Sequence, residues 1–211
     1  VSGGLHGVGI TVTNALSSWL EATVKRDSGE FSMRFENGRT VDKLKKIADV
    51  GPRTHGTKIR FSPNPKYYER PKFRVQQLRQ QAMDKAILIP GLEVVFKAPG
   101  LEDETFCFKN GLSEFMTSLM DETPIFEFTG QLGDMEKIHW FFAAFEETTP
   151  VYSKSYVNTI PTPRGGTHEK GFESGLLKAV REYIEMRPEL KKTLGKKTKI
   201  AASDLMINTQ L

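Results

Sequence analysis

Cysteine is almost absent from this sequence: Cys107 is the one cysteine in 211 residues. A single thiol cannot form a disulfide within the chain, which excludes the class of small secreted domains stabilised by disulfides. Cys107 alternates with Phe106 and Phe108 in a strand-like run, so we expect a reduced side chain that packs in the interior. This cysteine usage is typical of a reducing compartment, and we predict a cytoplasmic protein.

Long apolar runs are also lacking. No stretch approaches the roughly 18 consecutive apolar residues of a transmembrane helix, and no signal peptide is recognisable. Hydrophobic residues make up 38% of the chain and charged residues 27%, which is ordinary for a soluble globular protein. We therefore expect no membrane partner. Because Val1 directly precedes a glycine-rich segment, we also expect the chain to be a fragment of a longer protein.

The excess of positive charge is small. A formal net charge of +4 and an isoelectric point near 9.1 are compatible with a polyanionic partner, but many proteins with such a charge bind none. A basic run of lysines surrounds Gly195. Such runs are usually solvated loops, and the alternative is contact with DNA phosphates, which needs only mobile cations. The lysines of this run are Lys191, Lys192, Lys196, Lys197 and Lys199.

The first nine residues hold the clearest candidate site. Glycines at positions 3, 4, 7 and 9 precede an amphipathic run in which Val8, Val12, Ala15, Leu16 and Trp19 recur at helical spacing. The spacing predicts a helix that begins near Gly7 or Val8 and buries this stripe. Backbone N–H groups at a helix N-terminus favour an anion, and glycines allow a ligand to approach closely. The alternative is a tight turn without a ligand.

Two common nucleotide-binding loops are excluded. A Walker A loop requires Lys-Ser or Lys-Thr after its last glycine, whereas Ile10-Thr11 follows Gly9. A Rossmann fingerprint requires G-x-G-x-x-G after a strand, whereas the order here is Gly4-x-x-Gly7-x-Gly9. A second glycine pair, Gly165-Gly166, precedes another predicted helix and is either a bend or a second anion site.

The run from Val1 to Ser17, VSGGLHGVGITVTNALS, resembles the ATP-lid segment of the ATPase subunit of bacterial type IIA DNA topoisomerases. That subunit shares its GHKL fold with Hsp90, MutL and histidine kinases. Residues 56–61, GTKIRF, are similar to the GT-x-x-x-F strand of this family. Residues 156–168, YVNTIPTPRGGTH, resemble its second domain and are closer to the topoisomerase IV branch than to the gyrase branch.

The resemblance implies a binding site for ATP and assigns residues to it. Arg26 would lie at the mouth of the nucleotide pocket and Thr57 and Ile59 near the adenine, whereas spacing alone favours a solvated arginine and a core threonine. The glycine-rich segment would wrap the triphosphate through its backbone amides, with His6 as a further donor. The full set of cofactor-binding residues implied by the resemblance is Gly4, Leu5, His6, Gly7, Val8, Gly9, Arg26, Thr57 and Ile59.

The resemblance also implies what this chain lacks. The catalytic glutamate, the magnesium-binding asparagine and the adenine-reading aspartate of the family lie upstream of the lid, and its transducer lysine lies downstream. We therefore assign no catalytic residue and no metal ligand in this chain, although Mg²⁺ is an implied cofactor, and His168 receives no catalytic role. By itself the chain is expected to be inactive.

The predicted fold class is α+β. Residues 1–120 are expected to be the C-terminal part of a GHKL-type ATP-binding domain, a mixed or antiparallel sheet with helices on one face. Residues 121–211 are expected to be a truncated transducer domain of ribosomal-S5-domain-2-like fold. The elements predicted from periodicity and turn residues are strands at 20–25, 31–36, 56–61, 92–97, 105–109, 138–145 and 151–160, and helices at 75–89, 112–119 and from the N-cap Thr167 onward.

Turn residues and periodicity also predict how some of these elements pair and pack. Asp27-Ser28-Gly29 and Asn37-Gly38 are typical of tight hairpin turns, so we expect an antiparallel meander up to about residue 44. The strand at 151–160 is expected to lie beside the strand at 138–145. The stripe expected to be buried in the helix at 75–89 consists of Val75, Leu78, Ala82, Ala86 and Ile89.

The expected function is that of part of the ATPase subunit of a type II topoisomerase, which passes one DNA duplex through another. The resemblance implies DNA, a topoisomerase A-type subunit and a second copy of the ATPase subunit as partners. Three alternatives remain: the ATPase subunit of a gyrase, another GHKL ATPase of the MutL or Hsp90 kind, and a non-enzymatic interaction module whose glycine loop is merely a turn.

Overall fold

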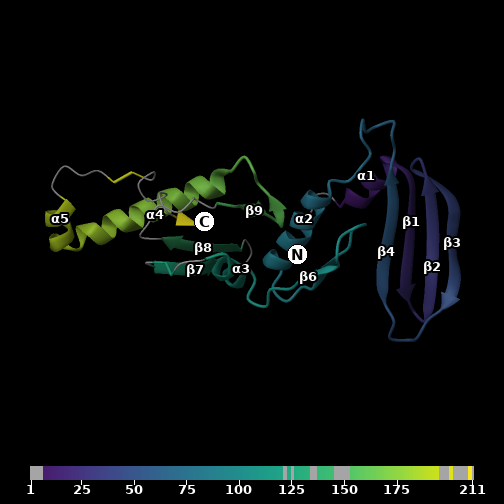
Figure 1. Cartoon of the computed structure of the whole chain (residues 1–211), viewed down its shortest axis with the longest axis horizontal. Helices are drawn as coiled ribbons and strands as arrows, with labels where there is room; N and C mark the ends of the chain where they lie inside the picture. Colours follow the sequence, from purple (N-terminus) through teal and green to yellow (C-terminus); the bar gives the residue numbers. More distant parts are fainter. Residues whose placement is uncertain are drawn as a thin grey trace. The chain divides into compact units, whose positions relative to one another are not determined.

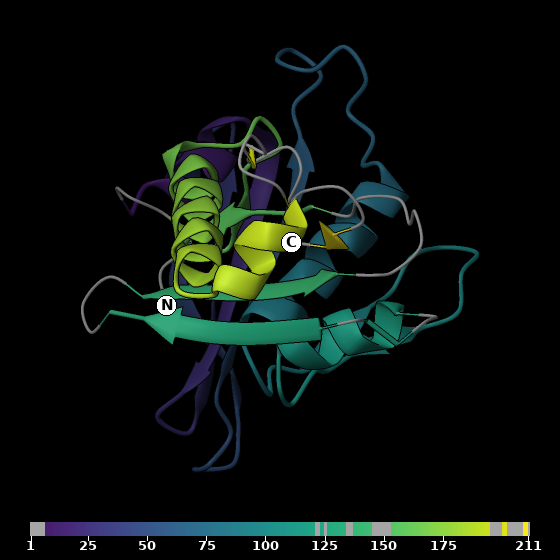
Figure 2. The ribbon, with the colours of Figure 1, turned by 90° about the vertical axis from the view of Figure 1, so that its left-hand side faces the viewer.

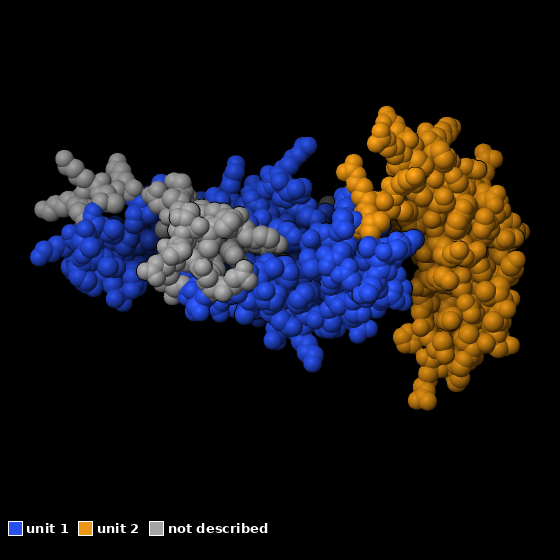
Figure 3. Space-filling view, in the orientation of Figure 1, with its two compact units in different colours: residues 1, 76–211 blue, residues 2–75 orange. Residues whose placement is uncertain are grey.

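The computed structural model describes residues 7–120, 123–124, 126–133, 137–144, 153–194, 200–201 and 209–210. The chain divides into two compact units, residues 2–75 (unit 2) and residues 76–211 (unit 1), which are coloured separately in Figure 3. Helices and antiparallel strands occur in both, so the predicted α+β class is confirmed. The predicted domain boundary after residue 120 falls inside unit 1. It stays a prediction, because a domain of the fold and a compact unit are defined by different criteria.

Unit 2 consists of a short helix followed by an antiparallel sheet (Figure 1). The predicted meander is confirmed, and its fourth strand pairs with the first, which gives the order β3-β2-β1-β4. The elements are α1 (Gly9–Ala15), β1 (Ser17–Arg26), β2 (Gly29–Glu36), β3 (Arg39–Asp49) and β4 (Gly56–Pro63).

Tight turns at left-handed backbone angles connect the first three strands. Asp27 and Ser28 have φ values of 50° and 59°, and Asn37 and Gly38 have φ values of 48° and 77°. Two successive residues with positive φ match the right-handed twist of the flanking strands, and aspartate, asparagine and glycine tolerate these angles best. Both hairpins predicted from these dipeptides are therefore confirmed.

The strand register separates an apolar face from a charged face. Ala22 of β1 lies opposite Met33 of β2 and Ile59 of β4, and Glu21 lies opposite an arginine on each side. Since partners in an antiparallel pair point to the same face and neighbours along a strand alternate, β2, β1 and β4 follow this division. On the charged face, the guanidinium groups of Arg34 and Arg60 lie 5.1 and 6.0 Å from the centre of the Trp19 ring.

β3 is an edge strand with an irregular register. Three register shifts interrupt its pairing with β2. Its apolar side chains Val41, Leu44 and Ile47 are all at least half exposed. Bulges and charged side chains are common in edge strands, because they prevent a strand of another molecule from pairing with the exposed edge.

Unit 1 contains four helices and three small antiparallel sheets among its described residues. The sheets have the orders β5-β6, β9-β10 and β11-β8-β7. The elements are α2 (Val75–Leu88), β5 (Val94–Phe96), β6 (Glu104–Phe106), α3 (Leu112–Leu119), β7 (Phe126–Leu132), β8 (Ile138–Ala144), β9 (Tyr156–Val157), β10 (Ile160–Pro161), α4 (Thr167–Glu185), α5 (Pro188–Leu194) and β11 (Thr209–Gln210).

The core of unit 1 joins elements from both sides of residue 120. Ile87 of α2 packs with Phe115 and Met116 of α3 and with Phe141 and Ala143 of β8. All five side chains are buried, which is the reason that residues 76–120 and 121–211 form one compact unit.

A second aromatic layer fixes α4 on the sheet of β7 and β8, where Figure 2 shows the helix crossing the strands. The ring of Phe172 lies 6.3 Å from Trp140 and 6.4 Å from Phe142. Offset aromatic pairs at such distances contribute beyond the area that they bury.

Polar contacts also tie α2 to distant segments of unit 1. Asp84 is only 4% exposed, and its carboxylate accepts a hydrogen bond of 2.7 Å from Gln80 and lies 3.9 Å from the ammonium group of Lys154. The neighbouring Lys85 donates to the backbone carbonyl and hydroxyl of Thr159 in the β9–β10 turn. Two adjacent residues of α2, the acidic Asp84 and the basic Lys85, thus contact Lys154, which precedes β9, and Thr159 in the β9–β10 turn.

Some predicted burial is wrong. In α1, Val8 and Val12 are 51% and 48% exposed, so the expected buried stripe does not form among the described residues. Trp19 belongs to β1 and not to the helix. In α2, Val75 and Leu78 are exposed, and burial is concentrated near the C-terminal end of the helix.

Cys107 is exposed, because β6 ends at Phe106 and the buried side of that strand carries the phenylalanine. The predicted pairing of residues 151–160 with β8 is also wrong. Within the described residues, β9 pairs with β10 across Asn158 and Thr159, and the neighbours of β8 are β7 and β11. Helix α4 begins at Thr167, one residue earlier than predicted, because its N-cap is Gly166 and not Thr167. Among the described residues, no helix is both long and apolar enough for a lipid bilayer.

Candidate functional site

The glycine-rich segment enters the structure at Gly7, since Gly4, Leu5 and His6 lie outside the described residues. Gly7 has a φ of 65°, a left-handed angle at which a side chain is strained. Val8 is the N-cap of α1, and Gly9 is the first helical residue. A Cβ atom placed on Gly7 or on Gly9 would meet no other described atom within 4 Å. The backbone at these two glycines is therefore open to a ligand.

The N-terminal end of α1 favours negative charge. Its first turn carries no acidic residue, and no described side chain caps it. The first hydrogen bond of the helix runs from the Val12 N–H to the Val8 carbonyl at 2.9 Å, which leaves the N–H groups of Gly9, Ile10 and Thr11 without an acceptor inside the helix. These groups and the helix dipole can together interact with a phosphate or carboxylate.

The three predicted residues of the sheet share one face. Val24 lies opposite Thr57 and Ala22 opposite Ile59, and Arg26 follows Val24 by two positions. The alternation of side chains therefore puts Arg26, Thr57 and Ile59 on the apolar face of the β1–β4 pair. All three are exposed, and the guanidinium of Arg26 is held 2.7 Å from the carboxylate of Asp27.

The two groups of predicted residues are not joined by any hydrogen bond or ion pair within the described part of the chain. Arg26 lies at the C-terminal end of β1, a strand of ten residues that spans about 30 Å, and α1 precedes the other end of that strand. The structure therefore brings Arg26, Thr57 and Ile59 to one face and presents Gly7 to Gly9 separately.

Carboxylates near the glycine segment have structural partners. Glu21 lies on the charged face of the sheet, 3.8 Å from Arg34 and 3.9 Å from Arg60. Asp27 pairs with Arg26. Nowhere in the described ranges do three or more histidine, cysteine, aspartate or glutamate side chains gather in a way that suits a metal ion.

The second glycine pair is a bend and not an anion site. Gly165 has a φ of 67°, and a Cβ on it would collide with the carboxylate of Glu169. Glu169 lies in the first turn of α4 and accepts a hydrogen bond from the Ser155 hydroxyl. The negative charge favoured by this helix end is thus supplied by the chain itself.

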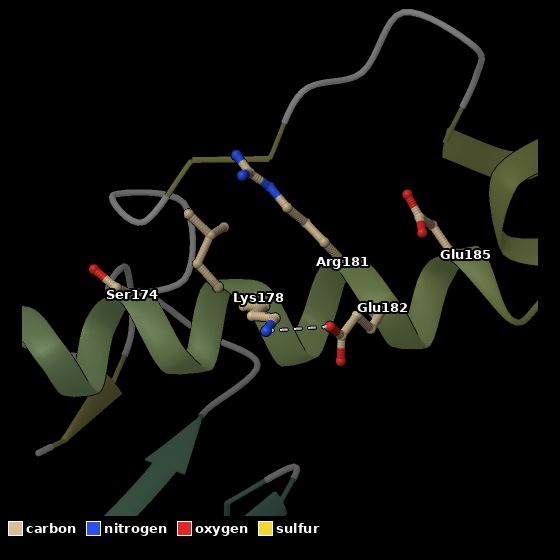
Figure 4. Close-up of a pocket in the computed structure, with 6 residues that line it drawn as sticks. Ser174, Lys178, Arg181, Glu182 and Glu185 are labelled. Carbon is tan, nitrogen blue, oxygen red and sulfur yellow. Dashed lines mark ion pairs between the residues drawn. The ribbon is translucent and has the colours of Figure 1, made fainter.

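A shallow hollow of about 340 Å³ lies along α4. Figure 4 shows that charges of both signs line it, with Lys178 and Glu182 paired at 3.8 Å. Arg181 donates a hydrogen bond of 2.5 Å to the Ile200 carbonyl, so this cation is already engaged. None of the predicted nucleotide-binding residues lines the hollow.

Asn64 shows no sequence signal beyond the Asn-Pro dipeptide that is typical of turns. In the structure it is the residue that holds the end of α1. Its backbone N–H donates to the Leu16 carbonyl at 3.0 Å, and its side-chain amide donates to Asn37 at 2.9 Å. The sequence does not reveal this contact because the two asparagines are 27 positions apart.

The family model described as DNA gyrase B matches residues 111–209. The B subunit of DNA topoisomerase 4 from Pseudomonas aeruginosa is 42% identical over 191 residues, which cover 88% of this chain and 30% of that protein. The chain therefore belongs to the family of B subunits of bacterial type II DNA topoisomerases. Within that family, its relatives at 34–42% identity include several B subunits of topoisomerase IV, and the chain spans about a third of their length.

Solved structures of two nucleotide-binding domains agree with this assignment. The chain is similar to the topoisomerase IV ATP-binding domain of Francisella tularensis, solved with a small-molecule inhibitor, with a TM-score of 0.74 and 33% identity over 100% of this chain and 57% of the other. It is also similar to the 43K ATPase domain of Thermus thermophilus gyrase B in complex with an aminocoumarin, with a TM-score of 0.74 and 26% identity over 98% of this chain and 58% of that one. The predicted family and GHKL-type fold are thereby confirmed.

Proposed function

We propose that this chain is part of the ATP-binding and ATP-hydrolysing subunit of a type II DNA topoisomerase that relaxes or decatenates DNA by passing one duplex through another. Membership of the B-subunit family supports the proposal. The single observation that carries the site is the open backbone at Gly7 and Gly9, directly before an uncapped helix end.

In this proposal the segment from Gly4 to Gly9 binds the phosphates of ATP. Its backbone N–H groups donate to phosphate oxygens, and His6 adds a side-chain donor. Thr57 and Ile59 line the part of the pocket nearer the base, and Arg26 lies at its mouth. Their shared, accessible face supports this role, because an aliphatic side chain and a hydroxyl suit a flat heterocycle with polar edges.

Magnesium chemistry does not fit the described residues. A Mg²⁺ ion takes oxygen ligands, and the carboxylates nearest the glycine segment in sequence, Glu21 and Asp27, are engaged by arginines. Catalysis of hydrolysis and the metal site are therefore assigned outside this chain. We further propose that residues 1–120 belong to the nucleotide-binding domain and residues 121–211 to the transducer. DNA, the A-type subunit and a second copy of the ATPase subunit are the partners, in the cytoplasm.

The site is tested by Gly9→Ala in the full-length protein. Gly9 has open space and no positive φ, so the added Cβ leaves the helix intact and blocks only a ligand that approaches the backbone. Gly175→Ala is a matched control, since Gly175 is also helical and open but lies on α4. We expect loss of binding of a non-hydrolysable ATP analogue in Gly9→Ala and unchanged binding in Gly175→Ala. Equal affinity in both variants would remove the glycine segment from the site.

The type of topoisomerase is tested with the A-type partner present. We expect ATP-dependent decatenation and relaxation and no negative supercoiling. Supercoiling would assign the chain to gyrase, which the match to the gyrase B family model keeps as the second candidate. ATP turnover without any change in DNA topology would instead favour a chaperone-like or repair ATPase.

A further inference from the structure

Within the part of the chain that the structure describes, helix α1 is held near its C-terminal end alone. Every described residue from Gly7 to Val12 is exposed, Thr13 and Asn14 are half-buried, and Ser17, at the start of β1, is 2% exposed. A helix of seven residues is about 10 Å long, so a tilt of about 10° at its base moves its first residue by about 2 Å. The position of Gly7 to Gly9 therefore depends on what fixes the junction between α1 and β1.

Two turns from elsewhere in unit 2 bind that junction. The Asn64 N–H donates to the carbonyl of Leu16, and the Asn37 N–H donates to the carbonyl of Ser18, both at 3.0 Å. Gly38 packs against the last residue of α1, since a Cβ on it would lie 3.4 Å from the Cα of Ala15. The β2–β3 turn and the end of β4 thus hold the junction from two directions.

A side-chain hydrogen bond joins the two turns. The Asn64 amide donates to the Asn37 side-chain oxygen at 2.9 Å, and the Asn64 side-chain oxygen accepts from the Lys66 N–H at 3.0 Å. The Asn64 amide is therefore fixed at both ends. We call this pair, Asn37 and Asn64, the asparagine clasp.

Hydroxyl groups continue the connection along α1. The Ser17 hydroxyl donates to the Thr13 carbonyl at 2.6 Å, and the Thr13 hydroxyl donates to the Gly9 carbonyl at 3.0 Å. Such bonds from serine and threonine to the carbonyl four residues earlier often bend a helix. A series of contacts thus runs from the clasped junction to the first residue of α1.

We propose that Asn64 and Asn37 are positioning residues for the phosphate-binding segment. They contact no nucleotide, and they act by fixing the base of α1 so that the Gly7 to Gly9 backbone is held in its binding position before ATP arrives. The inference rests on the proposed function. Preorganised backbone donors bind an anion more tightly because less conformational entropy is lost on binding.

The test compares variants of the full-length protein that differ at the clasp alone. Asn64→Asp keeps the oxygen that accepts from Lys66 but replaces the donor to Asn37 by an acceptor. Asn37→Gly keeps the left-handed turn angle and removes the acceptor, whereas Asn37→Asp keeps both the acceptor and a residue that tolerates this angle. Affinity for a non-hydrolysable ATP analogue is measured, with amide hydrogen exchange of residues 13–17 in the absence of nucleotide.

We expect Asn64→Asp and Asn37→Gly each to weaken nucleotide affinity about fivefold to tenfold and to speed exchange of residues 13–17. Asn37→Asp should stay within about twofold of the parent, and the double variant Asn64→Asp, Asn37→Gly should lose no more than either single variant. Unchanged affinity in both disrupting variants, or equal loss in Asn37→Asp, overturns the inference. If the Asn64→Asp variant does not fold, the nucleotide affinity of the Asn37→Gly variant alone tests the inference.

Gly9→Ala separates this inference from the proposed function. If Gly9→Ala abolishes binding while the disrupting clasp variants do not weaken it, the positioning role fails alone. If Gly9→Ala also binds normally, the proposed phosphate site fails and the clasp has no nucleotide to position.

Discussion

Arg79 of α2 and Glu104 of β6 form a bidentate ion pair. The Arg79 Nε atom lies 2.7 and 2.9 Å from the two carboxylate oxygens of Glu104, and its Nη2 atom lies 2.5 Å from one of them. The guanidinium also lies 5.4 Å from the centre of the Phe106 ring. Two parallel hydrogen bonds and a stacked ring fix this arginine more firmly than an ordinary surface pair.

This pair predicts a pH dependence of stability. The hydrogen bond from Arg79 lowers the pKa of Glu104 below its ordinary value, with the opposite charge adding to the effect and partial burial opposing it. A carboxyl whose pKa is lower in the folded state stabilises the fold above its unfolded pKa and ceases to do so as pH falls through the folded pKa.

We therefore expect Arg79→Gln to be less stable than the parent at neutral pH, and the gap to close as pH falls below about 4. Urea unfolding at a series of pH values measures this gap. Lys178→Gln, which removes an exposed pair within α4, is the control and should change stability by at most about 0.5 kcal/mol. An equal gap at pH 3 and at pH 7 would contradict the prediction.

Gly111 predicts a large loss of stability on substitution. It precedes α3 with a φ of 58°, and a Cβ on it would lie 2.9 Å from the Ile87 carbonyl oxygen and from the ring of Pro90. Gly111→Ala should cost about 2 to 4 kcal/mol in the free energy of unfolding, because strain and collision add. Gly100 has a φ of 78° but open space among its described neighbours, so Gly100→Ala should cost only about 1 to 2 kcal/mol. Similar losses in the two variants would show that the collision is relieved.

The basic run near Gly195 predicts salt-dependent DNA binding. Lys191 and Lys192 are exposed on α5, while Lys196, Lys197 and Lys199 lie outside the described residues. Neutralising all five in the full-length protein should lower DNA affinity and flatten its salt dependence by about 0.9 in log slope for each phosphate that is no longer neutralised. Nucleotide binding should not change. Neutralising five exposed lysines of unit 2, namely Lys43, Lys45, Lys46, Lys66 and Lys72, controls for the loss of five positive charges. An unaltered slope in the variant of the basic run would make the run an ordinary solvated segment.

Residues 1–211 by themselves should not hydrolyse ATP. Hydrolysis needs a base within reach of the attacking water and a group that offsets developing charge. The carboxylates nearest the glycine segment in sequence, Glu21 and Asp27, are paired with arginines. The measurement is phosphate release by the purified chain with Mg²⁺ present. Turnover that disappears in Gly9→Ala would place the whole catalytic site within this chain.

Local chemistry made much of unit 2 predictable. Asp27 and Asn37 indicate turns through backbone preferences that hold in any fold, and the alternating strands between them follow at once. Helix α3 is equally predictable from the sequence, because its apolar residues recur at regular helical spacing and two of them, Phe115 and Met116, are buried in the structure. In such segments the local preference and the final packing agree.

Long-range partners were not predictable in the same way. The periodicity of α1 identified an apolar side but not what covers Val8 and Val12, which stay exposed here. The side chains of Asn37 and Asn64 meet across 27 positions, a contact that no dipeptide preference encodes. For the same reason the sequence does not predict the pairing of β9 with β10, although Asn158 and Thr159 adopt left-handed angles typical of a turn.

The shared core of unit 1 has a mechanical consequence. Ile87 and Met116 lie before residue 120 and Phe141 after it, and close-packed interiors deform little. When α2 moves, β8 must therefore move with it as part of one rigid body. Motion between the proposed nucleotide-binding and transducer regions cannot pivot at residue 120 without opening this core, so an engineered flexible linker at residues 121–124 should leave the movement of α2 coupled to that of β8.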